Sequence, residues 1–261
     1  MISTKAMRKK ITPVQRRHAD YLRKKGLKVG LAYETRLRKA RRKEVRRLLS
    51  LCMDVNKTSW EDVMALHLDE SYLHKWFAGL FVDAGLPQAK STARDMSRGK
   101  AAPDENYWRT ELLRHAEEEA GEKIVLLQDT FRDELVSVVR KTLTEHSEMG
   151  VEGLAKKILK GYAEIELWQA RRIAQTETMI GLAQAGDIAA RSLDVGFNKQ
   201  WIISGIGNTR ETHEVMDGVI VDMDEPFELM DCQMMYPHDG SMGAPAGEII
   251  NCACSVLRLP K

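Results

Sequence analysis

The side chains that could do chemistry gather in the last sixty positions of the chain, from 201 to 260. Residues 210–218 supply arginine, histidine and aspartate, and residues 251–254 read Asn-Cys-Ala-Cys. Imidazole and thiolate groups are typical zinc ligands. Thiols beside an imidazole are also the parts of a nucleophilic centre. This short segment therefore raises a metal-binding, a catalytic and a purely structural hypothesis.

The metal hypothesis takes His213, Cys252 and Cys254 as ligands, with a fourth from His238, Asp239 or Cys232. Two residues two apart on a strand point the same way, which suits either a metal or a buried apolar face. Paired cysteines of structural zinc sites are usually separated by two to four residues, so this pair departs from the pattern. We expect no bound cofactor, and zinc is the alternative.

The structural hypothesis makes the two cysteines core residues. Arg210, His213 and Asp217 lie one helical turn apart, and we expect a hydrogen-bonded network that holds the terminal strand to this helix. Glu177 lies on the packed face of an upstream helix and needs a cationic partner, for which Arg210 is a candidate. The expected network comprises Glu177, Arg210, His213, Asp217, Asp239, Asn251, Cys252 and Cys254.

A catalytic hypothesis can be written in two ways. Cys252 or Cys254 with His213 and Asp217 or Asp239 would form a thiol triad. His213, His238 and Asp239 would form a metal-dependent hydrolase. Neither set carries an established motif such as His-Glu-x-x-His. We therefore expect no enzyme, and keep a metal- or thiol-dependent hydrolase at this cluster as the alternative.

The elements that position this segment are mostly helical. Apolar residues recur every three or four positions in 32–53, 122–148 and 164–194, and a further helix is expected over 107–120. Gly26, Gly30 and Gly161 are expected to interrupt helices. Short β-branched stretches at 200–204, 219–221 and 252–259 predict strands.

The predicted fold is therefore α+β, with a mainly α-helical N-terminal region of long helices and a small mixed α/β C-terminal domain. We predict three parts: a basic helical arm over 1–57, a helical region over 58–163, and the C-terminal domain over 164–261.

Charge is distributed unevenly along the chain. The first fifty residues hold 18 Lys plus Arg against three acids, a net +15, so the remainder carries −13 of the overall +2. A basic arm favours contact with a polyanion such as DNA. The alternative is a helix packed against the chain's own acidic body. The candidate DNA-binding residues are Arg16, Arg17, Arg23, Lys24, Lys25, Arg38, Arg41, Arg42, Arg46 and Arg47.

Composition narrows the class of protein. A hydrophobic fraction of 43% is enough for a packed core, and no run approaches eighteen apolar residues, so no membrane contact is expected. The N-terminus has no apolar stretch of the secretory kind. Four cysteines in 261 residues do not make a disulfide framework, which predicts a reducing compartment.

The order and spacing of the C-terminal motifs resemble those of a known family. They read Trp201…Arg210-x-x-His213-x-x-x-Asp217-Gly218…Phe227…Pro237-x-Asp239…Asn251-Cys252-x-Cys254, preceded by Arg-Ile-Ala-Gln-Thr-Glu at 172–177. This pattern is similar to the phage Mu F-like head morphogenesis domain of tailed bacteriophages, over roughly 164–261. The chain departs from the family at Ala253, where arginine is common.

The resemblance implies a structural minor head protein that is associated with the portal and acts in procapsid assembly and DNA packaging or delivery. The implied partners are the portal protein, the major capsid protein or scaffold, phage genomic DNA, and further copies of the chain around the portal. The implied location is the phage head interior near the portal vertex, after assembly in the host cytoplasm. A DNA-binding plug that acts only through its basic arm is the second non-enzymatic alternative.

Overall fold

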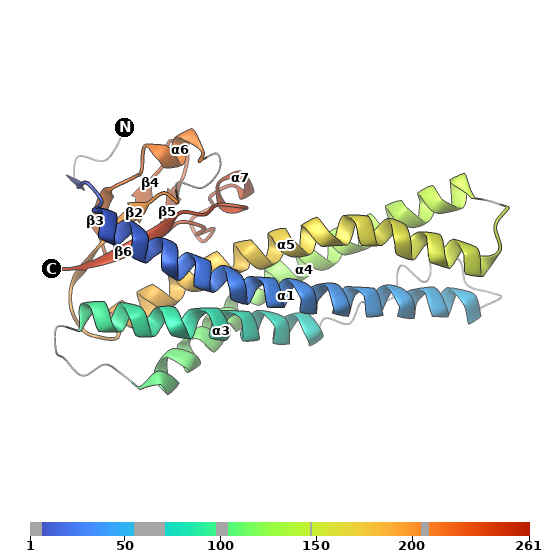
Figure 1. Cartoon of the computed structure of the whole chain (residues 1–261), viewed down its shortest axis with the longest axis horizontal. Coiled ribbons are helices and arrows are strands. Elements are labelled where there is room, and N and C mark those ends of the chain that lie inside the picture. The colour runs from blue at the N-terminus through green and yellow to red at the C-terminus, as the bar shows by residue number, and fades with distance from the viewer. Residues whose placement is uncertain (1–6, 55–70, 98–103, 147, 205–208) are drawn as a thin grey trace.

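A bundle of long helices carries a small antiparallel sheet at one end (Figure 1). The computed structural model describes residues 7–54, 71–97, 104–146, 148–204 and 209–261. The long helices are α1 Pro13–Asp54, α3 Ser71–Met96, α4 Glu105–Glu145 and α5 Val151–Arg191. Among the described residues, no helix has both the length and the apolar character that a bilayer crossing requires.

The sheet has the strand order β1-β3-β2-β6, and every pair in it is antiparallel. Its central strand, β2, is buried almost throughout. The four strands of this sheet are β1 Met7–Arg8, β2 Phe197–Ile202, β3 Val219–Asp222 and β6 Ser255–Pro260. Around it lie α6 Glu211–Glu214, the hairpin of β4 Phe227–Glu228 with β5 Gln233–Met234, and α7 Ala246–Ile249. The predicted α+β fold class is confirmed.

The predicted helix interruptions at glycine are wrong. In α1 the buried positions recur every three or four residues, and Gly26 and Gly30 fall on this stripe. A Cβ at Gly26 would lie 2.5 Å from Leu182 Cδ1, and one at Gly30 would lie 2.7 Å from Thr178 Oγ1. These glycines therefore let α1 approach α5 closely, and packing outweighs the low helix propensity of glycine.

Two further helices are longer than predicted because they also continue through a glycine. Gly161 packs against Val138, and α5 runs through it, so the predicted boundary at 163/164 falls inside α5. The helices expected over 107–120 and 122–148 are one helix, α4, which continues through Gly121. The boundary predicted at 57/58 lies outside the described residues.

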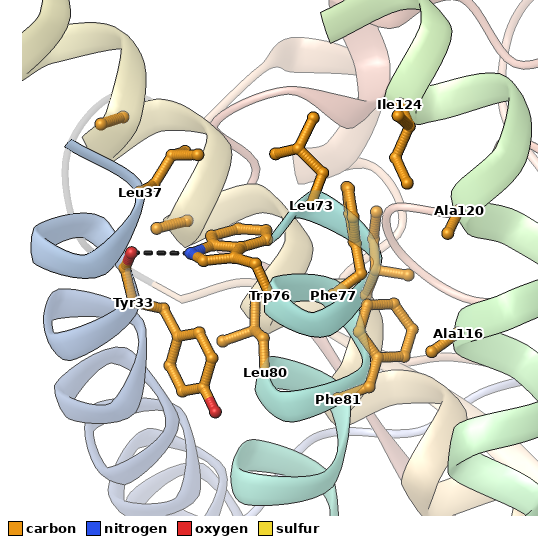
Figure 2. Close-up of a cluster of buried hydrophobic side chains, with 13 residues drawn as sticks. Tyr33, Leu37, Leu73, Trp76, Phe77, Leu80, Phe81, Ala116, Ala120 and Ile124 are labelled. Atoms are coloured by element: carbon orange, nitrogen blue, oxygen red, sulfur yellow. Dashed lines mark hydrogen bonds between the residues drawn. The ribbon is translucent and has the colours of Figure 1, made fainter. Parts of the chain in front are cut away.

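A hydrophobic cluster formed by α1, α3, α4 and α5, with its aromatic rings on α1 and α3, lies in the middle of the bundle (Figure 2). Trp76 packs edge-on against Tyr33 and Phe77, with ring centroids 5.9 and 5.1 Å apart. The buried indole Nε1–H of Trp76 donates to the backbone oxygen of Tyr33 at 2.8 Å, so its polar atom is satisfied (Figure 2).

One buried ion pair joins the sheet to the bundle. Arg258 of β6 donates through Nε to Asp187 Oδ1 of α5 at 2.9 Å, and its Nη2 lies 2.8 Å from the same oxygen. The guanidinium also donates to the backbone oxygen of Ala183. Gly186 makes room for this arrangement, since a Cβ there would lie 2.1 Å from Arg258 Nη1.

Replacing Gly186 with alanine should therefore destabilise the protein, despite the better helix propensity of alanine. Displacing a buried guanidinium costs at least as much as overpacking a core, about 1–3 kcal/mol. The matched control is Gly121→Ala, where a Cβ meets open space and should stabilise by up to about 1 kcal/mol. Urea unfolding of both variants measures the difference. Equal effects of the two substitutions would contradict this role of Gly186.

Candidate functional site

His213, Cys252 and Cys254 meet in the interior of the C-terminal domain. His213 comes from α6, and the two cysteines lie between α7 and β6. His213 Nδ1 is 3.4 Å from Cys252 Sγ and 3.5 Å from Cys254 Sγ. The three side chains are buried, with exposed fractions of 1%, 5% and 3% for the residues in that order. The grouping predicted from residue types is thus present as a geometric cluster.

The far side of the imidazole faces a carboxylate that the sequence did not indicate. His213 Nε2 lies 2.8 Å from Glu248 Oε2, within ion-pair distance but not in the alignment of a hydrogen bond. Thr212 Oγ1 donates to the same oxygen at 2.9 Å. Trp201 packs edge-on against the imidazole at 5.3 Å. These contacts fix the ring so that Nδ1 faces the sulfurs.

Two backbone features place the thiols. Asn251 adopts a positive φ of 57°, which turns the chain out of α7, and its N–H donates to Thr176 Oγ1 of α5 at 3.3 Å. Arg210 Nη2 donates to the backbone oxygen of Ile250 at 2.6 Å. The backbone N–H of Cys254 then points at Cys252 Sγ, 3.4 Å away.

The two thiols differ in acidity. The hydrogen bond from Cys254 lowers the pKa of Cys252, and that same bond, together with burial, raises the pKa of Cys254. A thiolate at Cys252 is therefore the first form that the pair reaches as the pH rises.

The expected hydrogen-bonded network does not form as one unit. Asp217 accepts from Arg16 of α1 at 2.8 Å and from the N–H of Ile203 at 3.0 Å, away from His213. Glu177 pairs with Lys123 of α4 at 3.1 Å, so the suggested Glu177–Arg210 pair is wrong. Asp217 and Glu177 both pair with residues far away in the sequence, and hydrophobic periodicity does not reveal such partners.

The predicted fourth ligands also have other roles. Asp239 accepts from the N–H groups of Met235 and Ser241, which closes its own loop. His238 Nε2 lies 3.0 Å from the backbone oxygen of Cys254 and must be the donor, while burial lowers its pKa. Cys232 is partly buried against the same hydrophobic cluster but lies outside the ligand group.

Neither triad drawn from the sequence is present, because Asp217 and Asp239 are both occupied elsewhere. Glu248 is the carboxylate beside His213 instead. Cys254 lines a cavity of about 70 Å³, which has room for a few water molecules but not for an organic substrate.

Most of the predicted DNA-binding side chains are used inside the fold. Arg38 and Arg42 lie 3.4 and 2.6 Å from the buried carboxylate of Glu166, and Arg41 stacks over Phe131 at 4.6 Å. Arg16, Arg23 and Arg47 pair with Asp217, Asp20 and Glu44. The exposed candidates without a described ion pair are Arg17, Lys24, Lys25 and Arg46. This distribution favours the alternative in which the basic helix packs on the acidic body, and DNA contact stays a prediction.

A second candidate site is an open groove between α1, α3 and the start of α4. Its volume is about 460 Å³, within the range of small-molecule sites. Lys90 Nζ pairs with Glu105 Oε2 at 2.5 Å, and Asp83 accepts from Tyr33 Oη at 2.7 Å. The polar and aromatic residues that line the groove are Tyr21, Lys25, Asp83, Lys90, Ser91, Arg94 and Glu105.

Lys199 is a buried cation that the sequence did not single out. It lies in the central strand β2, its Nζ donates to the backbone oxygen of Met235 at 2.8 Å, and it faces the ring of Phe227. Burial lowers its pKa to about 8. Among the residues that the structure describes, no carboxylate pairs with this ammonium, which makes the position costly for stability at neutral pH.

Comparison with known proteins gives one informative relative. The chain is 31% identical over 153 residues to the NAD(+)–arginine ADP-ribosyltransferase EFV of Enterococcus faecalis. The match takes in 54% of this chain and 29% of the relative, so the chain spans less than a third of that enzyme. No family model matches the chain, and no solved structure does.

This relative corrects the functional prediction. A structural minor head protein without enzymatic activity was expected, and the relative is named as an enzyme. The resemblance of the motif order to the Mu F-like head proteins stays a prediction. The expected portal, capsid and DNA partners and the virion location stay predictions.

Replacing Lys199 with methionine should remove a pH dependence of stability. Its pKa is about 8 in the folded state and about 10.4 in the unfolded state, so the unfolded chain binds more protons between these values. The free energy of unfolding of the wild type should therefore rise from pH 8 to 10 relative to Lys199→Met.

Urea unfolding at pH 7.5 and 9.5 measures this difference, with Lys24→Met as the exposed-lysine control. A stability difference between wild type and Lys199→Met that does not change with pH would contradict the assignment.

Proposed function

We propose that this chain takes part in NAD⁺-dependent ADP-ribosylation of arginine. The 31% identity with the Enterococcus transferase over 153 residues carries this proposal. The proposal needs a place for a dinucleotide with two phosphates and for a guanidinium acceptor. The groove between α1, α3 and α4 is the described cavity whose chemistry fits these demands best.

The groove supplies cations for phosphate. Lys25 and Arg94 line it and make no described ion pair, and Lys90 shares its charge with Glu105. Hydrogen bonds between such cations and phosphate oxygens are charge-assisted and strong. Tyr21 is exposed at the rim and offers a ring face for a nicotinamide or adenine base.

The groove also supplies carboxylates for the acceptor. Asp83 and Glu105 lie on the same lining, and a carboxylate orients a guanidinium through paired hydrogen bonds. Burial and the hydrogen bond to Asp83 raise the pKa of Tyr33 to about 12, which keeps this phenol protonated as a donor to Asp83. Glu105 is paired too, with Lys90 Nζ at 2.5 Å and Arg109 Nη2 at 3.8 Å, so a guanidinium acceptor would exchange with these cations.

The buried His213 cluster is a poorer reaction centre. Its neighbouring cavity of about 70 Å³ is far smaller than a dinucleotide site. We therefore assign a stabilising role to the His213 cluster and ligand binding to the groove.

The direct test measures NAD⁺ binding by calorimetry and transfer of labelled ADP-ribose to agmatine, a small arginine analogue. We expect Lys25→Ala and Arg94→Ala each to weaken NAD⁺ binding about tenfold, the effect of losing one charge-assisted hydrogen bond. Lys24→Ala is the matched control, because Lys24 is exposed on α1 but does not line the groove.

Two results would overturn the proposal. Absence of both NAD⁺ binding and transfer in the purified chain would remove the activity. Transfer that survives unchanged in the Lys25 and Arg94 variants would place the reaction elsewhere in the molecule.

A further inference from the structure

The buried donor atoms of His213, Cys252 and Cys254 converge on a single point. Each residue offers one ligand atom, and the three atoms all lie within 4.8 Å of one another. These atoms come from two segments about forty residues apart, and no apolar side chain in the hydrophobic cluster would satisfy them. A buried group of this kind needs either internal hydrogen bonds or an ion.

The spacing agrees with tetrahedral zinc. A zinc–nitrogen bond of about 2.0–2.1 Å and a zinc–sulfur bond of about 2.3 Å, at a tetrahedral angle, put nitrogen and sulfur about 3.6 Å apart. The two separations here, from His213 Nδ1 to the sulfurs, are 3.4 and 3.5 Å. The two nitrogen–sulfur separations thus match those of a zinc tetrahedron, and the two sulfurs lie within 4.8 Å of each other.

The surroundings of the imidazole agree with a metal as well. Ligating histidines usually donate their second ring N–H to a carboxylate, which fixes the tautomer and the orientation of the lone pair. Glu248 Oε2 lies 2.8 Å from His213 Nε2 and is itself held by Thr212. Glu248 is on the opposite side of the ring from the sulfurs, so it orients the ligand and does not complete the tetrahedron.

The backbone N–H of Cys254, directed at Cys252 Sγ, supports the sulfur charge of a metal thiolate. His238, Asp239 and Cys232 are engaged or outside the group, so the described side chains supply three ligands. A water molecule is the usual fourth ligand where a protein supplies three.

We propose that His213, Cys252 and Cys254 bind one zinc ion with a water molecule as the fourth ligand, and that Glu248 orients the imidazole. The ion ties α6 to the turn between α7 and β6, so its main effect is on the stability of the C-terminal domain. This inference is independent of the proposed function, because the groove lies between α1, α3 and α4.

The experiment measures metal content by mass spectrometry in the reduced, tag-free full chain. We expect about one zinc per chain in the wild type and in Cys232→Ser, the matched thiol control, and a loss of zinc in Cys254→Ser. A chelator should lower the melting temperature of the wild type, and added zinc should restore it.

Cobalt(II) provides a second readout that does not depend on a variant that folds. Added to the metal-free wild type, it should give a thiolate-to-cobalt charge-transfer band and the visible absorption of a tetrahedral site. Absence of zinc together with absence of these bands would overturn the proposal. Zinc retained in both Cys252→Ser and Cys254→Ser would overturn it too.

Discussion

A buried arginine–aspartate pair holds the two halves of this molecule together. Arg258 comes from the last strand and Asp187 from the last long helix, and both are largely out of contact with water. Removing two charges from water is costly unless they are paired closely and their remaining hydrogen bonds are satisfied. The oxygens of Ala183 and Val256 accept from the same guanidinium, and Gly186 leaves space for it. A shift of the sheet along α5 would leave the buried charges of Arg258 and Asp187 without their partners. The ion pair therefore fixes the position of the sheet on α5.

The thiol cluster depends on that docking. Once β6 is fixed on α5, Asn251 can bond to Thr176, and the turn before β6 brings Cys252 and Cys254 under α6. Arg16 of α1 joins the same domain through Asp217. Contacts with α5 and α1 thus hold the C-terminal domain in place. The polar groups in its interior contact one another or bind an ion. The groove lies on a different part of the bundle, so stability and ligand binding involve separate sets of residues.

Local sequence signals predicted the classes of element well and their partners poorly. Hydrophobic spacing indicated long helices followed by a small mixed domain, and residue types alone grouped His213 with Cys252 and Cys254. Glu248 was missed because it lies on a four-residue helix with no buried residue to mark it. Gly26 and Gly30 were misread because their effect comes from α5, more than 140 positions away. The partners of Glu177 and Asp217 lie on other helices, which no periodicity encodes. The functional prediction rested on short motifs, whereas the relative that contradicts it is similar through identity spread over 153 residues.

A double-mutant cycle on Arg258 and Asp187 tests most directly whether the bundle and the sheet form one unit. Arg258→Ala, Asp187→Ala and the double variant would be unfolded in urea and followed by tryptophan fluorescence together with circular dichroism. We expect each single substitution to cost about 3 kcal/mol, and the double variant to lose less than the sum by at least about 1.5 kcal/mol, because a lone buried charge is worse than none. Losses that add to within about 0.5 kcal/mol would contradict the account.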